Sequence, residues 1–317
     1  MSFFDPAKFT KETIESLKEQ LSGKSIIAAS GGVDSTVAAA LVSKAVGDEL
    51  LAIYVDTGYM RLGESEFVSS MLSELGVNHK VVNASERFYE GLKGVIDPEE
   101  KRKIIGELFI RIFEEESKEY GGKFLVQGTI APDWIESGGG MRDTIKSHHN
   151  VGGLPEDMEM SLCEPIRELY KDEVRSLAEF LDVPVAHRQP FPGPGLAVRV
   201  MGEATPERTE VVRQACHIVE DELELAAKEG KMELPWQYFA VILPVKTVGV
   251  QGDVRAYGNT IAVRAVQSYD AMTAQALELP YTVLKKISER ITRELKSEVN
   301  RVVYDITDKP PGTIEWE

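Results

Sequence analysis

The segment Ser30–Thr36, SGGVDST, combines hydroxyl groups, two glycines and one carboxylate. The glycines let a phosphate approach the main chain closely, and the Ser and Thr hydroxyls can donate hydrogen bonds to its oxygens. Asp34 suits an anion site only if a cation such as Mg²⁺ lies between its carboxylate and the phosphates. The segment matches neither GxxxxGK(S/T) nor GxGxxG. It therefore predicts a nucleotide-phosphate site of another type, and the alternative is an ordinary strand-to-helix turn capped by Asp or Ser.

The elements around this segment place it at the edge of a sheet. Residues 25–29 are a short apolar run typical of a buried strand, and residues 37–46 form an apolar helix. Because strands and helices continue to alternate, we expect a doubly wound parallel α/β fold with ligands at the carboxyl ends of the strands. Further strands are predicted at 50–55, 79–82 and 124–127, and further helices at 6–22, 64–75, 98–118 and 171–181.

Two stretches interrupt this alternation. Residues 128–155 have no apolar period and are rich in Gly, Asp, Ser and His, which predicts a long loop that is either a functional lid or a disordered segment. Residues 190–195, PFPGPG, indicate a domain boundary near residue 200. We therefore expect one domain over residues 1–200 and a smaller α+β domain over residues 201–317. The second domain is predicted to contain helices at 206–228 and 281–295 and strands at 238–245, 260–266 and 301–306.

The composition excludes several classes of protein. The 317 residues include 36 Lys and Arg against 52 Asp and Glu, and this net charge of −16 argues against a partner held mainly through nucleic-acid phosphates. The two cysteines, Cys163 and Cys216, cannot build a disulfide framework or a four-thiolate zinc site, and they favour a reducing cytosol. No apolar run is long enough to span a bilayer, and charges near the first residue argue against a signal peptide. We expect a cytoplasmic protein that binds neither nucleic acid nor membrane.

SGGVDST resembles the signature of the pyrophosphatase-loop (PP-loop) ATPases, which cleave ATP between its α and β phosphates. Other motifs resemble the synthetase part of GMP synthetase, in particular the separate synthetase subunit of the two-subunit, archaeal-type enzyme. The resemblance implies an adenine nucleotide alpha-hydrolase-like fold. It also implies a reaction in which ATP adenylates O2 of xanthosine monophosphate (XMP) and ammonia then displaces AMP to give GMP. These motifs are DPEEKRKIIGELF (97–109), QGTIAPDWIES (127–137), IKSHHNVGGLP (145–155), EPIRELYKDEVR (164–175), HRQPFPGPGLAVRV (187–200), LPVKTVGVQGD (243–253) and NRVVYDITDKPPGTIEWE (300–317).

The resemblance also implies roles for individual residues. Residues Ser30–Thr36, called the phosphate segment from here on, would hold ATP, with Asp34 as the Mg²⁺ contact. The residues after the second strand would receive the adenosine. Asp133 has two open interpretations, assistance to the metal or formation of a turn. The ATP residues are Ser30, Gly31, Gly32, Val33, Asp34, Ser35, Thr36, Val55, Asp56 and Gly58; the XMP residues are Arg102, Asp253, Lys309 and Glu315; the lid residues are Lys146, His148 and His149.

The chemistry of the XMP residues fits these roles. An arginine such as Arg102 can bind oxygens with two hydrogen bonds, although Lys101, Arg102 and Lys103 alone would read as a solvated helix face. Lys309 can meet the phosphate dianion, and the Glu315 carboxylate can accept hydrogen bonds from purine N–H groups. The adjacent lid histidines lack the spacing of a paired metal site, so we expect them to donate to phosphate or substrate rather than bind zinc.

The resemblance further implies partners. Ammonia would come from a separate glutaminase (class I amidotransferase) subunit, since we expect this chain to lack one, and free ammonia would substitute. A homodimer formed by the C-terminal domain, which also binds XMP, is expected.

The enzymatic alternative is another PP-loop ATPase such as a tRNA-thiolating enzyme, which would need reactive cysteines or a basic surface. Cys163 and Cys216 read instead as core residues. A non-catalytic nucleotide-binding regulator is the other alternative, and it would be expected to lack Asp34 or the C-terminal lysine and glutamate.

Overall fold

The computed structural model describes residues 4–136, 160–184, 188–251, 253–269 and 271–317. The chain forms two compact units, and each unit is built from segments that are far apart in the sequence. No helix in these ranges combines the length and the apolar character needed to cross a membrane. The first unit contains residues 1–57, 63–85 and 106–188, and the second contains residues 58–62, 86–105 and 189–317.

A parallel sheet of five strands forms the centre of the first unit, in the order β3-β2-β1-β4-β5. Because β1 lies between β2 and β4, the chain turns in opposite directions on its two sides, and ligands bind at such a switch point. The doubly wound parallel sheet predicted from the sequence is confirmed. The strands are β1 (Ser25–Ala28), β2 (Leu50–Asp56), β3 (His79–Asn83), β4 (Phe124–Val126) and β5 (Ser161–Cys163).

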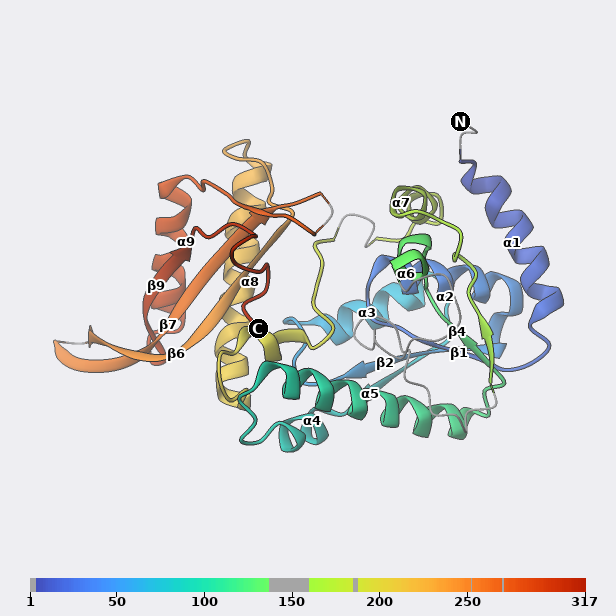
Figure 1. Cartoon of the computed structure of the whole chain (residues 1–317), viewed down its shortest axis with the longest axis horizontal. Coiled ribbons are helices and arrows are strands. Elements are labelled where there is room, and N and C mark those ends of the chain that lie inside the picture. Colours follow the sequence, from blue (N-terminus) through green and yellow to red (C-terminus); the bar gives the residue numbers. More distant parts are fainter. Residues whose placement is uncertain (1–3, 137–159, 185–187, 252, 270) are drawn as a thin grey trace. The chain divides into compact units, whose positions relative to one another are not determined.

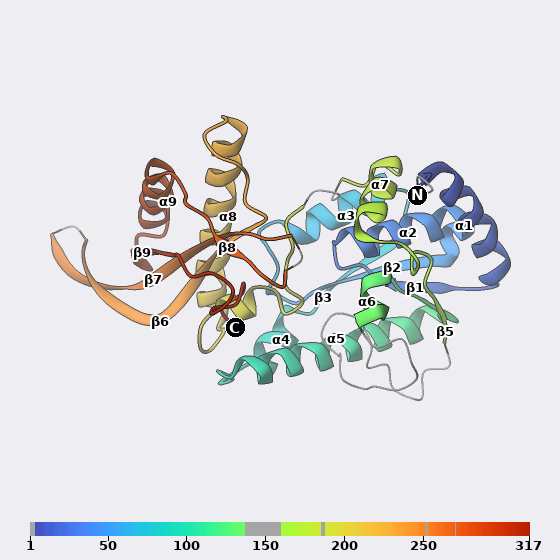
Figure 2. The ribbon, with the colours of Figure 1, turned by 45° about the horizontal axis from the view of Figure 1, so that its top comes forward.

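Helices cover both faces of this sheet. Figures 1 and 2 show α2 and α7 on one face and the part of α5 from Gly106 onward on the other. Apolar side chains of β1 and β2, such as Ile26 and Ile53, are fully buried between these layers, and their burial stabilises the sheet. The helices named here are α1 (Pro6–Gln20), α2 (Val33–Val46), α3 (Glu64–Glu74), α4 (Ser85–Gly91), α5 (Pro98–Tyr120), α6 (Ala131–Glu136) and α7 (Lys171–Phe180), with a 3-10 turn η1 (Gly47–Glu49).

Two expectations about this region need correction. The stretch 128–155 was expected to be loop throughout, but α6 begins at Ala131. The side chain of Asp133 accepts a hydrogen bond from the N–H of Ile130 at 3.0 Å, and this contact supports the first turn of the short helix. The edge strand β5 was not predicted, because it has only three residues and its Leu162 is half exposed.

The second unit is built on a sheet in which two long antiparallel strands form a curved hairpin (Figure 1). β9 pairs in parallel with residues 259–264 of β7, and the short β8 pairs with the last residues of β7, Val266 and Gln267. Helices α8 and α9 pack against the sheet and bury residues such as Val219 and Ile287. The elements are η2 (Gly195–Arg199), α8 (Pro206–Lys228), β6 (Gln237–Gln251), β7 (Val254–Gln267), β8 (Gln275–Ala276), α9 (Tyr281–Glu294) and β9 (Val299–Asp305).

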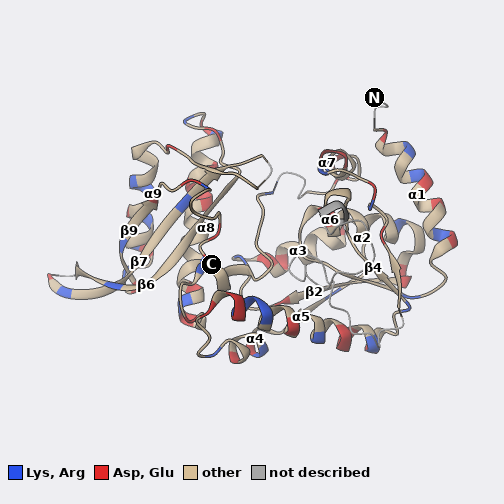
Figure 3. Cartoon of the chain, in the orientation of Figure 1, with Lys and Arg blue, Asp and Glu red and all other residues tan. Residues whose placement is uncertain are grey.

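Charges of both signs are distributed along the helices. Figure 3 shows Lys and Arg interspersed with Asp and Glu along α1 and α5. On α1, Lys8 and Glu12 face each other as an exposed pair one helical turn apart. Such exposed pairs contribute little to stability and keep the surface solvated.

Candidate functional site

The segment Ser30–Thr36 lies at the switch point of the first unit, between β1 and α2. Gly31 has a φ of 75°, and a Cβ at this position would lie 2.9 Å from a methyl group of Val68. Glycine is therefore required both by the backbone conformation and by the space. The hydroxyls of Ser30 and Ser35 are 2.9 Å apart. Within the described ranges no side chain caps the first turn of α2, so its backbone N–H groups are available to an anion.

Asp34 is the unusual member of this segment. Among the described residues, its buried Oδ1 atom has no hydrogen-bond partner. Burial raises the pKa of Asp34, the nearby Lys171 lowers it, Asp133 raises it and Arg175 lowers it. A buried carboxylate oxygen without a donor is costly unless a ligand satisfies it. This oxygen therefore fits a contact to Mg²⁺.

The described ranges contain no group of three His, Cys, Asp or Glu residues that could hold a metal ion by themselves. Proteins usually bind Mg²⁺ through one or two carboxylates together with substrate phosphates, and Asp34 offers one such carboxylate. Lys171 and Arg175, on the first turns of α7, supply positive charge near Asp34. These two cations therefore offset the negative charge of Asp34 and Asp133 beside the Ser30–Thr36 segment.

Gly128 follows β4 and packs directly on the phosphate segment. A Cβ at Gly128 would lie 2.8 Å from the backbone carbon of Asp34 and 2.8 Å from the nitrogen of Ser35. We expect Gly128→Ala to push this backbone out of place and to reduce ATP turnover at least tenfold. Gly106→Ala is the matched control, because a Cβ there meets no atom within 4 Å. Steady-state pyrophosphate release measures both variants, and equal rates for them would contradict a packing role for Gly128.

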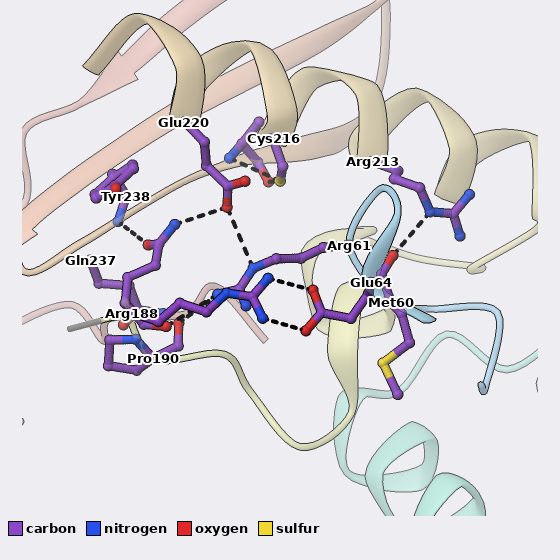
Figure 4. A network of polar contacts seen from close by, with 12 residues as sticks. Met60, Arg61, Glu64, Arg188, Pro190, Arg213, Cys216, Glu220, Gln237 and Tyr238 are labelled. Carbon is purple, nitrogen blue, oxygen red and sulfur yellow. Dashed lines mark hydrogen bonds and ion pairs between the residues drawn. The ribbon is translucent and has the colours of Figure 1, made fainter. Parts of the chain in front are cut away.

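The buried Glu64 and the partly buried Arg188 form a two-pronged ion pair in the first unit (Figure 4). Arg188 donates from Nη1 and Nη2 to the two carboxylate oxygens at 2.7 and 2.6 Å, and its guanidinium also stacks 4.5 Å from the ring centre of Phe67. A Cβ at Gly31 would lie 3.2 Å from Oε1 of Glu64. Such a bidentate pair fixes both side chains strongly. The pair therefore supports the phosphate segment from the side of α3.

The structure divides the predicted adenosine residues between the units. Val55 and Asp56 end β2, next to β1, so they lie at the same sheet edge as the phosphate segment. Val55 is buried, which leaves its main chain for contact, and Asp56 accepts a hydrogen bond from Ser65 at 2.6 Å. Gly58 belongs to the second unit, where its carbonyl accepts hydrogen bonds from Tyr89 and Arg213. The role of Gly58 in ATP binding stays a prediction.

The loop that contains Gly58 is held in the second unit by arginines. Arg61 donates to the carbonyl oxygen of Gln189 at 3.2 Å and pairs with Glu220 at 3.5 Å (Figure 4). Arg213 donates from Nε to the carbonyl oxygen of Met60 at 3.0 Å. Because Arg213 holds two main-chain carbonyls of the loop and the side chain of Arg61 is anchored outside it, the loop has a fixed conformation within the unit.

Lys101 and Arg102 both contact Glu317. The side chain of Lys101 is 0% exposed; its ammonium donates to the carbonyl oxygens of Ala197 and Val200, at 3.2 and 2.8 Å, and to the Glu317 carboxylate. Arg102 donates to the backbone oxygen of Glu317. The solvated helix face that these residues suggested on their own is therefore wrong for Lys101. Arg102, predicted to bind XMP, lies beside the C-terminal segment that carries Glu315.

The remaining predicted XMP residues occupy different parts of the second unit. Glu315 is held by Arg199, which donates to both of its carboxylate oxygens. Lys309 donates to the carbonyl oxygen of Ala271 at 2.8 Å. Asp253 is exposed at the turn between β6 and β7, with a φ of 61°. Figure 1 shows this hairpin end pointing away from the C-terminal segment of the same unit. A shared XMP site for these residues stays a prediction.

Comparisons with known proteins complete the description of these sites. The GMP synthase C terminal domain family matches residues 224–316, and the phosphoadenosine phosphosulfate reductase domain family matches residues 24–104, which include SGGVDST. The B subunit of the glutamine-hydrolyzing GMP synthase of Thermococcus kodakarensis is 58% identical over 313 residues, or 98% of this chain and 99% of that protein. The Methanopyrus kandleri protein of the same name is 56% identical over 318 residues, or 99% and 100% of the two chains. This chain belongs to the family of GMP synthase B subunits.

A solved structure is also similar to this family member. NMN synthetase from Francisella tularensis superposes with a TM-score of 0.48 and 16% sequence identity, covering 67% of this chain and 84% of that chain.

Several residues around the sites of this member of the GMP synthase family were not identified from the sequence. Gly128, Glu64 and Arg188 support the phosphate segment, and Arg199 holds Glu315. Gly128 lies in the motif QGTIAPDWIES, and Arg188 and Arg199 lie in HRQPFPGPGLAVRV, so motif membership was the available signal for these three residues. Glu64 lies in none of the motifs. The predicted lid residues Lys146, His148 and His149 lie outside the described residues.

Proposed function

We propose that this chain is the ATP-dependent synthetase subunit that converts XMP into GMP with ammonia, releasing AMP and pyrophosphate. The single observation that carries this proposal is the identity of more than half of all residues, over nearly the whole chain, to proteins named as B subunits of GMP synthase. The phosphate segment supports the ATP step, because uncapped N–H groups and an unsatisfied Asp34 oxygen meet at one sheet edge.

The reaction needs two displacements. In the first, O2 of XMP bonds to the α-phosphorus of ATP as the bond to the β-phosphate oxygen breaks and pyrophosphate leaves. In the second, ammonia bonds to C2, the C2–O2 bond breaks and AMP leaves, while the nitrogen gives up its proton. The N–H groups at the start of α2 would bind the departing pyrophosphate, and Lys171 and Arg175 would offset its charge. Mg²⁺, held in part by Asp34, would neutralise phosphate charge when bound.

XMP recognition is assigned to the second unit. Arg102 would donate to oxygens of the nucleotide, Lys309 to its phosphate, and Glu315 would accept from purine N–H groups, while Asp253 takes a further contact. A lid that contains Lys146, His148 and His149 would keep water from the adenylate.

The partners follow from the same family relation. The relatives are named as subunits of a glutamine-hydrolyzing enzyme, so we propose a separate glutaminase subunit as the source of ammonia. We also propose a homodimer through the second unit, supported by exposed apolar side chains on its hairpin, namely Val250, Val254 and Tyr257. The reaction is placed in the cytoplasm, where nucleotide substrates and reduced cysteines occur.

A tRNA-thiolating function is less well supported. Burial, with a smaller effect of Glu164, raises the pKa of Cys163 to about 11. Burial also raises the pKa of Cys216, and both thiols are buried. A thiol that stays protonated at neutral pH is a poor nucleophile. Neither cysteine therefore has the reactivity that sulfur transfer requires.

An activity assay tests the proposal. The purified chain with ATP, Mg²⁺, XMP and ammonium chloride is expected to form GMP, AMP and pyrophosphate in equal amounts, measured by liquid chromatography. Glutamine in place of ammonium is expected to give no GMP, because no glutaminase is assigned to the chain. Turnover with glutamine alone would contradict the separate subunit, and cleavage of ATP to ADP would contradict the proposed reaction.

A further inference from the structure

Arg199 is a completely enclosed charge in the second unit. Its side chain is 0% exposed, and its guanidinium lies 4.2 Å from the ring centre of Phe239 and 5.2 Å from that of Phe191. Burial alone disfavours its charged form, but the Glu315 carboxylate more than offsets this and raises the pKa of Arg199. An enclosed guanidinium stacked on two rings can adopt very few orientations. The guanidinium of Arg199 can therefore hold a hydrogen-bonded partner in one fixed orientation.

The group that Arg199 contacts is the Glu315 carboxylate. Arg199 donates from Nη2 to Oε1 at 2.8 Å and from Nε to Oε2 at 3.1 Å. Gln237 donates a further hydrogen bond to Oε1 at 2.7 Å. A carboxylate offers about four acceptor positions, two on each oxygen. Among the residues that the structure describes, three of these positions are therefore used, and one position on Oε2 is left.

The residues on both sides of Glu315 are also held in place. Arg264 donates to the carbonyl oxygens of Thr313 and Ile314 at 2.9 and 3.1 Å, and the Trp316 indole donates to Asp305 at 3.0 Å. Unlike Arg199, the Glu315 side chain is 15% exposed. The carboxylate is thus the part of this buried pair that a ligand can reach.

We propose that Arg199 is a positioning residue for nucleobase recognition: with Gln237 it orients the Glu315 carboxylate so that one acceptor position of Oε2 faces a purine N–H. This inference rests on the proposed function, in which Glu315 contacts XMP. Both carboxylate oxygens of Glu315 already accept hydrogen bonds from Arg199 or Gln237, so the free position on Oε2 is an acceptor position too. The site then selects a purine that presents an N–H and rejects one that presents a ring-nitrogen acceptor, because two acceptors would face each other.

Kinetic analysis of Arg199→Lys and Glu315→Gln tests this inference, with saturating ammonium chloride as the nitrogen source. Lys at position 199 keeps the positive charge but cannot donate to both carboxylate oxygens of Glu315 at once. We therefore expect the KM for XMP to rise about tenfold and the KM for ATP to change less than twofold. Gln at 315 keeps the shape but loses the charge, and we expect the KM for XMP to rise about 30-fold. Both substitutions act on the same group, the Glu315 carboxylate. The KM for XMP of the double variant is therefore expected to match that of Glu315→Gln within about twofold.

Arg290→Lys is the matched control, since Arg290 also pairs with carboxylates in the second unit but has its partners Asp221 and Glu222 on α8. Its KM for XMP is expected to equal that of the wild type. Gln237→Met provides a second route if Glu315→Gln does not fold. It removes one neutral donor and is expected to raise the KM for XMP about threefold.

The outcomes separate the inference from the function on which it rests. Multiplying effects in the double variant, about 300-fold in total, would overturn the inference by showing that Arg199 and Glu315 act independently. An unchanged KM for XMP in Arg199→Lys, with an active wild type, would overturn it alone. A wild-type chain that makes no GMP would overturn the proposed function and this inference with it.

Discussion

Asp34→Asn is expected to reduce pyrophosphate formation by roughly 10³-fold, because the amide removes the negative charge that a bound Mg²⁺ would contact. Folding should not suffer in the same way. Burial raises the pKa of Asp34, and its Oδ1 has no protein partner in the described chain, so the charged group destabilises the fold at neutral pH. Single-turnover pyrophosphate release and thermal melting measure the two effects separately.

The same variant gives a pH dependence with a defined sign. Since the folded-state pKa lies above the ordinary value of 3.8, the wild-type carboxyl contributes most to stability below that value. This contribution is lost as the pH rises through the folded-state pKa. The Tm of Asp34→Asn relative to the wild type should therefore increase as the pH rises from 3.8 through the folded-state pKa. A difference that stays constant over this range would contradict the raised pKa.

Asp133→Asn is the control for a general charge effect near the phosphate segment. Asn keeps an oxygen that can accept the hydrogen bond from the N–H of Ile130. If Asp133 acts only in the first turn of α6, pyrophosphate formation should fall less than tenfold. A loss as large as that of Asp34→Asn would assign Asp133 to the metal as well.

Lys101→Met is expected to destabilise the chain by about 3–5 kcal/mol, the usual effect of removing one partner from a buried ion pair. The substitution leaves the Glu317 carboxylate and two carbonyl oxygens without the ammonium. Urea unfolding followed by tryptophan fluorescence measures the effect, since Trp236 and Trp316 both belong to the second unit.

Two further variants check the origin of that effect. Lys103→Met makes the same change at an exposed position of α5 and should alter the free energy of unfolding by less than about 0.5 kcal/mol. Lys101→Met combined with Glu317→Leu removes both charges and should recover part of the lost stability. A double variant that is less stable than Lys101→Met would contradict an uncompensated carboxylate as the cause.

The sheet of the first unit could be predicted because local sequence carries the information. β1 and β2 are unbroken apolar runs that end at polar residues, and both faces of each strand are buried. The phosphate segment was recognised for the same reason, since all of its donors lie within a few residues of one another. By contrast, β6 extends to Gln251, well beyond the apolar run 238–245, because its outer half pairs with β7 in a mostly exposed hairpin.

The supporting contacts could not be predicted because their partners are remote in sequence. Lys101 and Glu317 are 216 positions apart, and Arg199 and Glu315 are 116 positions apart. A lysine in a charged run of helix normally faces solvent, and nothing within a helical turn marks Lys101 as buried. The position of Gly128 against Asp34 likewise depends on the pairing of β1 with β4.

The separation between Lys101 and Glu317 has a consequence for biosynthesis. On the ribosome, helix α5 emerges long before the carboxylate that neutralises its buried lysine, and the intervening chain includes the whole of α8 and the β6–β7 hairpin. Residues 86–105 therefore stay in contact with solvent until Glu317 has been synthesised, and only then pack into the second unit. A nascent chain stalled anywhere in the last strand would keep this segment accessible to proteases, although the sheet of the first unit would already be complete.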